Sequence, residues 1–312
     1  MSFKSARVFT QSTARPKHFG GLRRAEWLWG YAFISLNLLG FTIFSLGPII
    51  ASLGMAFMEW PLLKPPRFVG LANFVRLLDD QLFRTVFLNT WYYVAGFVPL
   101  VTVLSFLLAV MLNRQVRGIQ ILRTAYFLPS ITLIVSVAMV WQWMLDPQAG
   151  VVTWVLKALR LPVLEFLADR RLAMPTLIVV GVWTEVGYYA VIYLAGLQSI
   201  PSSLYEAAEI DGANAWQRLV HITVPLISPT TFFVLVTGMI SGWQVFALPY
   251  LMTGGGPANS TRTLLQYVYE QAYGSLRMGY AALMAWVLFL IIFGVTLLQW
   301  RFSKGGEHVL AQ

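Results

Sequence analysis

Cysteine is absent from the 312-residue chain, which excludes disulfide bonds, thiolate metal sites and a cysteine nucleophile. Charge is scarce too: Asp, Glu, Lys and Arg make up 11% of the residues, whereas an average soluble domain has about 25%. Hydrophobic residues make up 58%, so a water-facing surface cannot be built around the whole molecule. We therefore expect an integral membrane protein.

Other absences argue against several classes of function. The three histidines lie far apart and show no ligand spacing, so we expect no metal site: His18, His221 and His308. The sequence has no Gly-x-x-x-x-Gly-Lys-Ser/Thr phosphate loop, so the chain is not expected to hydrolyse ATP itself. The net charge of +9 comes from basic residues between long apolar blocks, which is typical of membrane proteins and not of nucleic-acid binding. We expect no enzyme activity, no cofactor and no nucleic-acid partner.

Long apolar runs are what the sequence does contain. A bilayer-spanning helix needs about 20 mainly apolar residues. Six stretches meet this requirement, about 29–57, 86–112, 124–145, 174–198, 230–252 and 280–301. They predict an all-α fold, a polytopic bundle of six transmembrane helices. Prolines inside several stretches indicate that the helices pack around one another, because neighbours must satisfy the carbonyl groups that proline leaves free.

The distribution of Lys and Arg gives an orientation. With the N-terminus inside, the inner segments hold 12 basic residues and the outer segments hold 10. This small excess favours a chain with both termini in the cytoplasm. We expect a basic cytoplasmic tail over residues 1–25, a membrane domain over 26–303 and a short cytoplasmic tail over 304–312.

The polar loop between the fourth and fifth spans carries the most information. Ser203 and Glu206 have the spacing of a capping box, which predicts the start of a helix. Gly212 supplies the permissive backbone that ends such a helix. A second short helix can run over about 213–221 until Pro225 stops it. The loop is therefore predicted to form a helix, a glycine turn and a second helix.

Such an elbow has two uses at a membrane surface. It can rest on lipid headgroups as an amphipathic element, or it can present a rigid knob to a soluble partner. Three acidic residues and a single arginine suit anionic lipid badly, which favours docking to a protein: Glu206, Glu209, Asp211 and Arg218.

The same loop, residues 200–225, resembles the EAA signature of inner-membrane permeases of binding-protein-dependent ABC importers. The fixed positions fall at the family's spacing, with Val224 where leucine is usual: Glu206-Ala207-Ala208, Gly212, Ile222 and Pro225. Further segments resemble the maltose and glycerol-3-phosphate permease branch, among them Arg123–Pro129, Ala195–Pro201 and Leu251–Pro257. The resemblance covers roughly residues 25–303.

This resemblance implies an ATP-driven importer of sugars or sugar-like solutes in the bacterial cytoplasmic membrane. It implies four kinds of partner: two separate ATP-binding subunits, a second homologous permease, an extracytoplasmic solute-binding protein, and a sugar or sugar-phosphate substrate. The loop would face the cytoplasm and couple to the ATPase through Glu206, Ala207, Ala208, Asp211 and Gly212. Glu206 would make a charged contact, the alanines would allow close approach, and Gly212 would set the bend.

The substrate path should be lined by the few polar and aromatic residues within the spans. Glu185 is the carboxylate nearest to mid-membrane depth, and either the path or a neighbouring helix can explain it. Trp243 and Gln244 resemble the family's cavity stretch, and an indole with an amide suits a sugar. The candidates for the path are Trp243, Gln244, Phe246, Tyr250, Glu185 and Tyr188.

Two other classes compete with this interpretation. An ion-coupled secondary transporter of a small polar solute is the main alternative, but it would be expected to carry more intramembrane ionisable groups and an inverted repeat. A membrane enzyme would need a convergent catalytic set, and no span holds a histidine cluster or a pair of acids.

Overall fold

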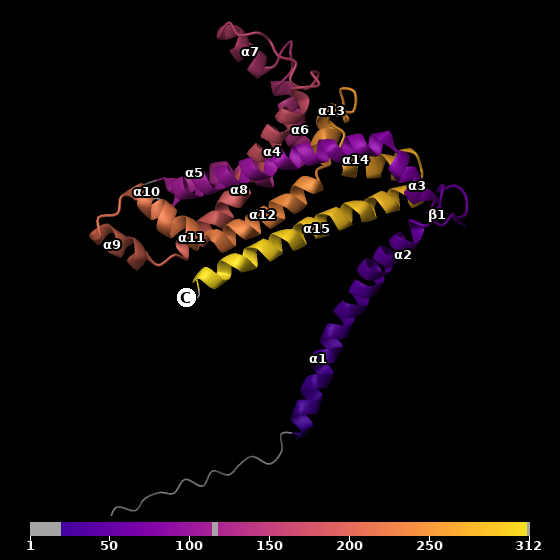
Figure 1. Ribbon diagram of the computed structural model, residues 1–312, viewed down its shortest axis with the longest axis horizontal. Helices are drawn as coiled ribbons and strands as arrows, with labels where there is room; N and C mark the ends of the chain where they lie inside the picture. The colour runs from indigo at the N-terminus through magenta and orange to yellow at the C-terminus, as the bar shows by residue number, and fades with distance from the viewer. Residues whose placement is uncertain (1–19, 114–117, 311–312) are drawn as a thin grey trace, which may run out of the picture. The chain divides into compact units, whose positions relative to one another are not determined.

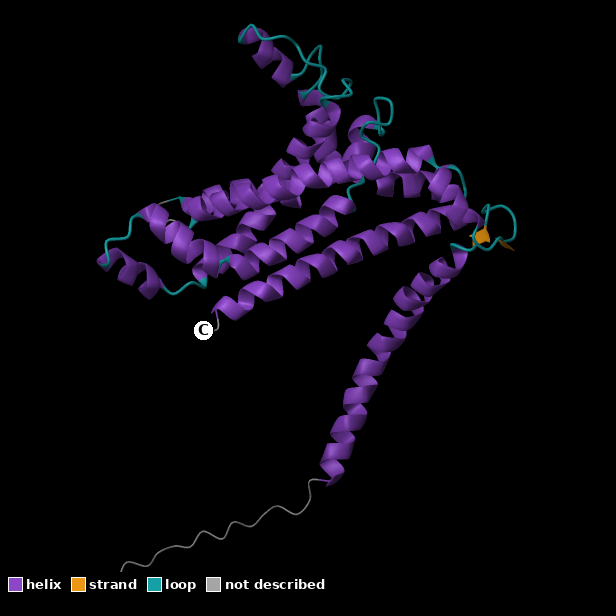
Figure 2. Ribbon diagram, in the orientation of Figure 1, coloured by secondary structure: helices purple, strands orange, loops and turns teal. Residues whose placement is uncertain are grey.

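The structure is a computed structural model that describes residues 20–113 and 118–310. These residues are mostly helical, with one small strand pair and several connecting loops (Figure 2). The elements are α1 (Gly20–Phe41), the π-helical turn η1 (Thr42–Leu46), α2 (Gly47–Met55), β1 (Met58–Glu59), β2 (Arg67–Phe68), α3 (Ala72–Asp79), α4 (Gln81–Leu112), α5 (Ile119–Ile131), α6 (Ile134–Met144), α7 (Val151–Ala158), α8 (Ala173–Gln198), α9 (Ser202–Ile210), α10 (Ala215–Arg218), η2 (Leu219–Thr223), α11 (Val224–Leu226), α12 (Ser228–Trp243), α13 (Ala247–Thr253), α14 (Leu264–Tyr269), η3 (Glu270–Gly274) and α15 (Met278–Leu310).

The expected tails differ from the structure in extent. Residues 1–19 of the expected N-terminal tail lie outside the described residues, and helix α1 already begins at Gly20. At the other end, α15 continues as a helix to Leu310, through most of the segment expected to be a tail.

The N-terminal unit comprises residues 1–54. From Glu26 to Met55 the chain forms a helix long and apolar enough to cross a membrane, including the turn η1. Within this unit the described side chains form no buried core. A long apolar helix of this kind is what an anchor in lipid, or against another subunit, requires.

The second unit, residues 55–312, holds the core. Helix α8 packs along α4 and α5, and α12 packs against α4 (Figure 1). The buried residues of α4 recur every three or four positions and so form one face of the helix: Val86, Thr90, Tyr93, Val94, Phe97, Val98, Val101, Ser105, Ala109 and Leu112. Leu88 and Val103 lie on the remaining face and are exposed. This division places the opposite face of α4 toward lipid or a partner.

Four helices in the described part of the chain are long and apolar enough to cross a membrane, or up to six if each of two bent pairs is one span. The four are Glu26–Met55, Gln81–Leu112, Ala173–Gln198 and Met278–Arg301. The two bent pairs are α5 with α6, at 98°, and the helix Ala215–Leu226 with α12, at 64°.

The expected third and fifth spans are not single straight helices. In the third, the bend follows Ile131, where the Ser130 hydroxyl donates to the Thr184 carbonyl (2.9 Å) and accepts from the Tyr188 N–H (3.1 Å). In the fifth, α12 ends at Trp243, and the Thr263 hydroxyl donates to the Val245 carbonyl (2.8 Å) in the break before α13. Side-chain to backbone hydrogen bonds therefore tie the first break to α8 and satisfy a free carbonyl at the second.

The contact between α5 and α8 depends on Gly187. A Cβ atom at this position would overlap the carbonyl oxygen of Tyr126 on α5. We expect Gly187→Ala to lower the free energy of unfolding by about 1–3 kcal/mol, because backbone and not a flexible side chain would have to move. Thermal unfolding in detergent measures the effect. Gly238→Ala is the matched control, since the nearest atom to its added Cβ is 3.9 Å away. An equal loss in both variants would contradict the close packing at Gly187.

Candidate functional site

The loop between α8 and α12 forms the predicted elbow. Helix α9 ends at Ile210, and Gly212 adopts a left-handed conformation with φ of +80°. The Ala213 N–H bonds to the Ala208 carbonyl at 2.8 Å, which closes the helix end in the manner of a Schellman motif. The predicted glycine turn is confirmed, because a residue with a Cβ would be strained at this φ.

The helix starts in the elbow differ from those predicted. Helix α9 begins at Ser202, directly after Pro201, and no side chain caps it, so the predicted capping box of Ser203 and Glu206 is wrong. The capping box lies instead at α10, where the Asn214 side chain accepts from the Gln217 N–H (2.9 Å) and the Gln217 side chain accepts from the Asn214 N–H (2.8 Å). Because α9 begins two residues earlier than a Ser203 cap predicts, Ser203 is already inside the first turn.

Pro225 does not end the second helix of the elbow, contrary to the sequence prediction. The helix runs from Ala215 through the π-helical turn η2 to Leu226, and the bend into α12 follows at Ile227. In η2 the Val224 N–H bonds to the Leu219 carbonyl, five residues earlier. Pro225 directly follows this π-helical turn and lies one residue before the helix ends at Leu226.

Two contacts join the first helix of the elbow, α9, to its second helix. Glu209 on α9 forms an ion pair with Arg218 on α10, with 2.9 Å between Oε2 and Nη1. The hydroxyl groups of Tyr205 and Thr223 lie 2.9 Å apart and share a hydrogen bond. The elbow is therefore braced on both sides of the glycine turn and can move as one piece.

The exposed surface of the elbow combines acidic and apolar side chains. Glu206, Ala207 and Asp211 are exposed, and the Glu206 carboxylate forms no hydrogen bond or ion pair with described residues. Ile210 is 88% exposed and Trp216 is 70% exposed. The sequence analysis did not predict either residue as part of the docking surface. A large apolar residue in an otherwise polar surface loop could have indicated such a role. Ala208 is half-buried and, with Asp211 and Gly212, lines a pocket beside the turn.

Within the spans, Glu185 of α8 contacts Ser241 of α12. The Ser241 hydroxyl lies 3.0 and 3.2 Å from the two carboxylate oxygens and donates to them. Glu185 is half-buried, and Tyr188, one turn further along α8, is 47% exposed. This carboxylate therefore has a polar partner on a neighbouring helix and still reaches the surface of the chain.

Trp243 and Gln244 have different surroundings although they are adjacent. Trp243 is 2% exposed, and its indole packs against the rings of Phe87 and Trp91, with centroids 5.8 and 5.7 Å apart. Gln244 follows the end of α12 and is exposed. The structure thus places the tryptophan in the core of the chain and the amide on its surface.

Phe246 and Tyr250 belong to a row of four aromatic rings that the sequence did not reveal. The Phe246 ring contacts Tyr250 and Tyr269, each with 5.1 Å between centroids, and Tyr269 contacts Tyr273 at 5.2 Å. The three tyrosines are between 40% and 65% exposed. The row joins α13, α14 and η3, so only the fold brings it together. An aromatic surface with hydroxyl groups suits a ligand that has both apolar and polar faces.

The architecture described above has known counterparts. The model of the binding-protein-dependent transport system inner membrane component family matches residues 86–305. The chain belongs to this family. Its curated relatives include the probable ABC transporter permease protein YesP of Bacillus subtilis, which is 36% identical over 91% of this chain and 93% of the relative. The arabinooligosaccharides transport system permease protein AraP of Halalkalibacterium halodurans is 33% identical over 89% of each chain.

A solved structure extends the match to the fold. The permease superposes with a TM-score of 0.80 on a chain of a bacterial alginate ABC transporter in complex with an alginate pentasaccharide-bound periplasmic protein. The two chains are 27% identical, and the match covers 92% of this permease and 97% of the other chain. The relatives named here are transport subunits and not enzymes, which agrees with the absence of a phosphate loop from this sequence.

Proposed function

We propose that this permease is one membrane subunit of an ATP-driven importer of sugars or sugar-like solutes in the bacterial cytoplasmic membrane. The observation that carries the proposal is the braced elbow of α9, Gly212 and α10, which presents the unpaired Glu206 and the exposed Trp216 at one end of the helices (Figure 1). The partner that we propose for this exposed elbow is a cytoplasmic ATP-binding subunit. The elbow then faces the cytoplasm, and both termini lie inside.

The other partners follow from the same assembly. The family's own description makes transport dependent on a binding protein, and the alginate transporter is seen in complex with its periplasmic protein. We include in the proposal two ATP-binding subunits, a solute-binding protein on the outer side and a second homologous permease. One chain then forms half of the path across the membrane.

The elbow also offers a mechanical link to the path. Its second helix leads through the bend at Ile227 into α12, and α12 carries Ser241 and, just beyond its end, Gln244. A force on the braced elbow is therefore transmitted through this bend and along α12 toward these polar groups. Transport additionally requires that the ATPase subunits bind the elbow more tightly in one conformation, because a ligand shifts an equilibrium only through a difference in affinity.

Sugars fit the polar and aromatic groups of the path. Aromatic rings stack on the C–H faces of a sugar, while carboxylate and amide groups bond its hydroxyls. Glu185, Tyr188, Gln244, Phe246 and Tyr250 are the contacts that we propose, together with the other tyrosines of the aromatic row, Tyr269 and Tyr273. Trp243 contributes by supporting Gln244 from the core. The arabinooligosaccharide permease AraP agrees with this substrate class.

The proposal is tested by reconstituting the complete complex in liposomes and measuring solute uptake with and without ATP. Uptake of the solute carried by the binding protein should need both ATP and that protein. ATP-independent uptake by the isolated permease, driven by an ion gradient, would contradict the proposal and favour the secondary transporter.

Trp216→Ala should weaken the assembly with the ATP-binding subunit. An exposed tryptophan at the centre of an interface contributes about 2 kcal/mol or more, which corresponds to an affinity about 30-fold lower. The free energy of unfolding should change by less than about 0.5 kcal/mol, because the side chain is 70% exposed. Co-purification and titration with the ATP-binding subunit measure the effect. Trp154→Ala is the matched control, since Trp154 lies on α7 and is 71% exposed; equal weakening would argue against docking at the elbow.

A further inference from the structure

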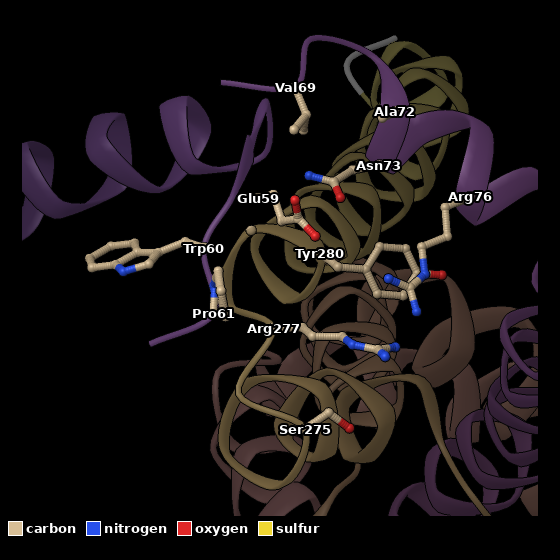
Figure 3. Close-up of a pocket in the computed structure, with 11 residues that line it drawn as sticks. Glu59, Trp60, Pro61, Val69, Ala72, Asn73, Arg76, Ser275, Arg277 and Tyr280 are labelled. Atoms are coloured by element: carbon tan, nitrogen blue, oxygen red, sulfur yellow. The ribbon is translucent and has the colours of Figure 1, made fainter. Parts of the chain in front are cut away.

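A polar pocket lies at the end of the helices opposite the elbow. It is formed by the β1–β2 hairpin, α3 and the turn before α15 (Figures 1 and 3), and its volume is about 300 Å³. Its polar lining includes Glu59, Asn73, Arg76, Ser275, Arg277 and Tyr280. We call it the arginine pocket, because Arg76 and Arg277 extend into it from different elements (Figure 3).

The walls of the arginine pocket are fixed by hydrogen bonds. The hairpin joins the turn before α15 through Leu62 N–H to the Leu276 carbonyl (3.2 Å) and Met278 N–H to the Trp60 carbonyl (3.0 Å). The buried Asn73 side chain donates to the carbonyls of Ala56 and Met58, at 2.9 and 3.0 Å. The cavity is therefore pre-formed, so a ligand would not have to order its walls.

Neither arginine has an anionic partner among the described residues. The guanidinium carbon of Arg76 lies 4.8 Å from the ring centroid of Tyr280, and no carboxylate lies within 4.0 Å of either guanidinium. Glu59 is exposed and also lines the pocket, and its carboxylate points into it without pairing to either arginine (Figure 3). The two guanidinium groups therefore present N–H donors without a carboxylate acceptor in one concave site, which favours an anion that can accept hydrogen bonds from them.

The nearby Asp80 forms no ion pair with either arginine, and its oxygens are engaged elsewhere. One oxygen accepts from the N–H groups of Leu82 and Phe83 (2.9 and 3.0 Å), and the other accepts from the hydroxyls of Tyr267 and Tyr280 (2.7 and 2.6 Å). Burial acts to raise the pKa of Asp80, but the four hydrogen bonds outweigh it, so the pKa lies below its usual value. Asp80 therefore does not take up the N–H donors of the two guanidinium groups, which stay available for a ligand.

We propose that the arginine pocket binds an acidic side chain, Asp or Glu, on the solute-binding protein. This proposal rests on the proposed function, which places the elbow in the cytoplasm and therefore the pocket on the outer side. The positive pocket and a carboxylate are complementary in charge, and a guanidinium can hold a carboxylate with two parallel hydrogen bonds. An anionic sugar is the less suitable occupant, because the proposed path would bring it into contact with the Glu185 carboxyl group.

The test uses the complete importer in liposomes and titrates it with its solute-binding protein while ATP hydrolysis is measured. Arg277→Gln should raise the half-saturating concentration of binding protein about tenfold, with the maximal rate retained. Arg76→Gln should act in the same direction. The double variant should also lose most of the salt dependence of half-saturation. Arg67→Gln is the matched control, because Arg67 is an exposed arginine of the same hairpin that does not line the pocket.

Three outcomes would overturn the proposal. Unchanged half-saturation in the Arg277 and Arg76 variants would show that the pocket is not used. An equal shift in Arg67→Gln would show that general positive charge attracts the binding protein. A changed preference between acidic and neutral sugars at unchanged half-saturation would place the solute, and not the binding protein, in the pocket. If the wild-type complex is not stimulated by the binding protein at all, the proposed function itself is wrong.

Discussion

Glu206→Lys is expected to reduce ATP-dependent uptake by at least about tenfold while the permease still inserts into the membrane. The carboxylate is exposed and has no partner within the described chain, so its loss should leave the fold intact. Reversing the charge of a group that is desolvated against a partner costs several kcal/mol. Recovery of the ATP-binding subunit with the tagged permease should fall in parallel with uptake.

Glu209→Gln provides the comparison on the same helix. Glu209 is already paired with Arg218, and its side chain is 70% exposed, so removing this ion pair should cost less than about 1 kcal/mol. Uptake should stay within about twofold of the wild type, because the Tyr205–Thr223 hydrogen bond still joins the two parts of the elbow. Normal uptake and normal complex recovery in Glu206→Lys, or equal losses in both variants, would refute the assigned role of Glu206.

Glu185→Gln should lower sugar uptake by about tenfold, with assembly and binding-protein affinity unchanged. A carboxylate bonded to a sugar hydroxyl contributes about 1.5–3 kcal/mol, and a neutral amide replaces only part of it. Because glutamine can still accept from the Ser241 hydroxyl, the contact between α8 and α12 should persist. The rate of uptake is measured at saturating binding protein.

Ser241→Ala separates the two explanations of Glu185. If the carboxylate only links two helices, Ser241→Ala and Glu185→Gln should lower thermal stability together and affect uptake to the same extent. If it contacts the solute, Glu185→Gln should reduce uptake strongly at nearly unchanged stability. Full uptake by Glu185→Gln would remove this residue from the path.

The elbow was largely predictable from sequence because its signals are local. Gly212 needs a backbone conformation that glycine readily adopts, and the EAA spacing places it between two short helices. The caps were less predictable: Ser203 and Asn214 are both suitable residues, and only the path of the chain after Pro201 decides which of them caps a helix.

The bends and the aromatic row depend on tertiary contacts and could not be predicted in this way. The break after Trp243 is stabilised by Thr263, which lies 20 residues later and shows no sign of that role in the sequence. Tyr269 and Tyr273 join Phe246 only because α14 and η3 fold back beside α13. Residues that face a path in such a permease are therefore found by structure and not by pattern.

The four hydrogen bonds at Asp80 have a consequence for how the transporter opens. One half-buried carboxylate fastens the first turn of α4 to Tyr267 of α14 and Tyr280 of α15, so separating these helix ends would break two charge-assisted hydrogen bonds. In the proposed pair of permeases, we therefore expect this cluster to move as a unit. The outward gate would then open at the interface between the two subunits and not inside this chain.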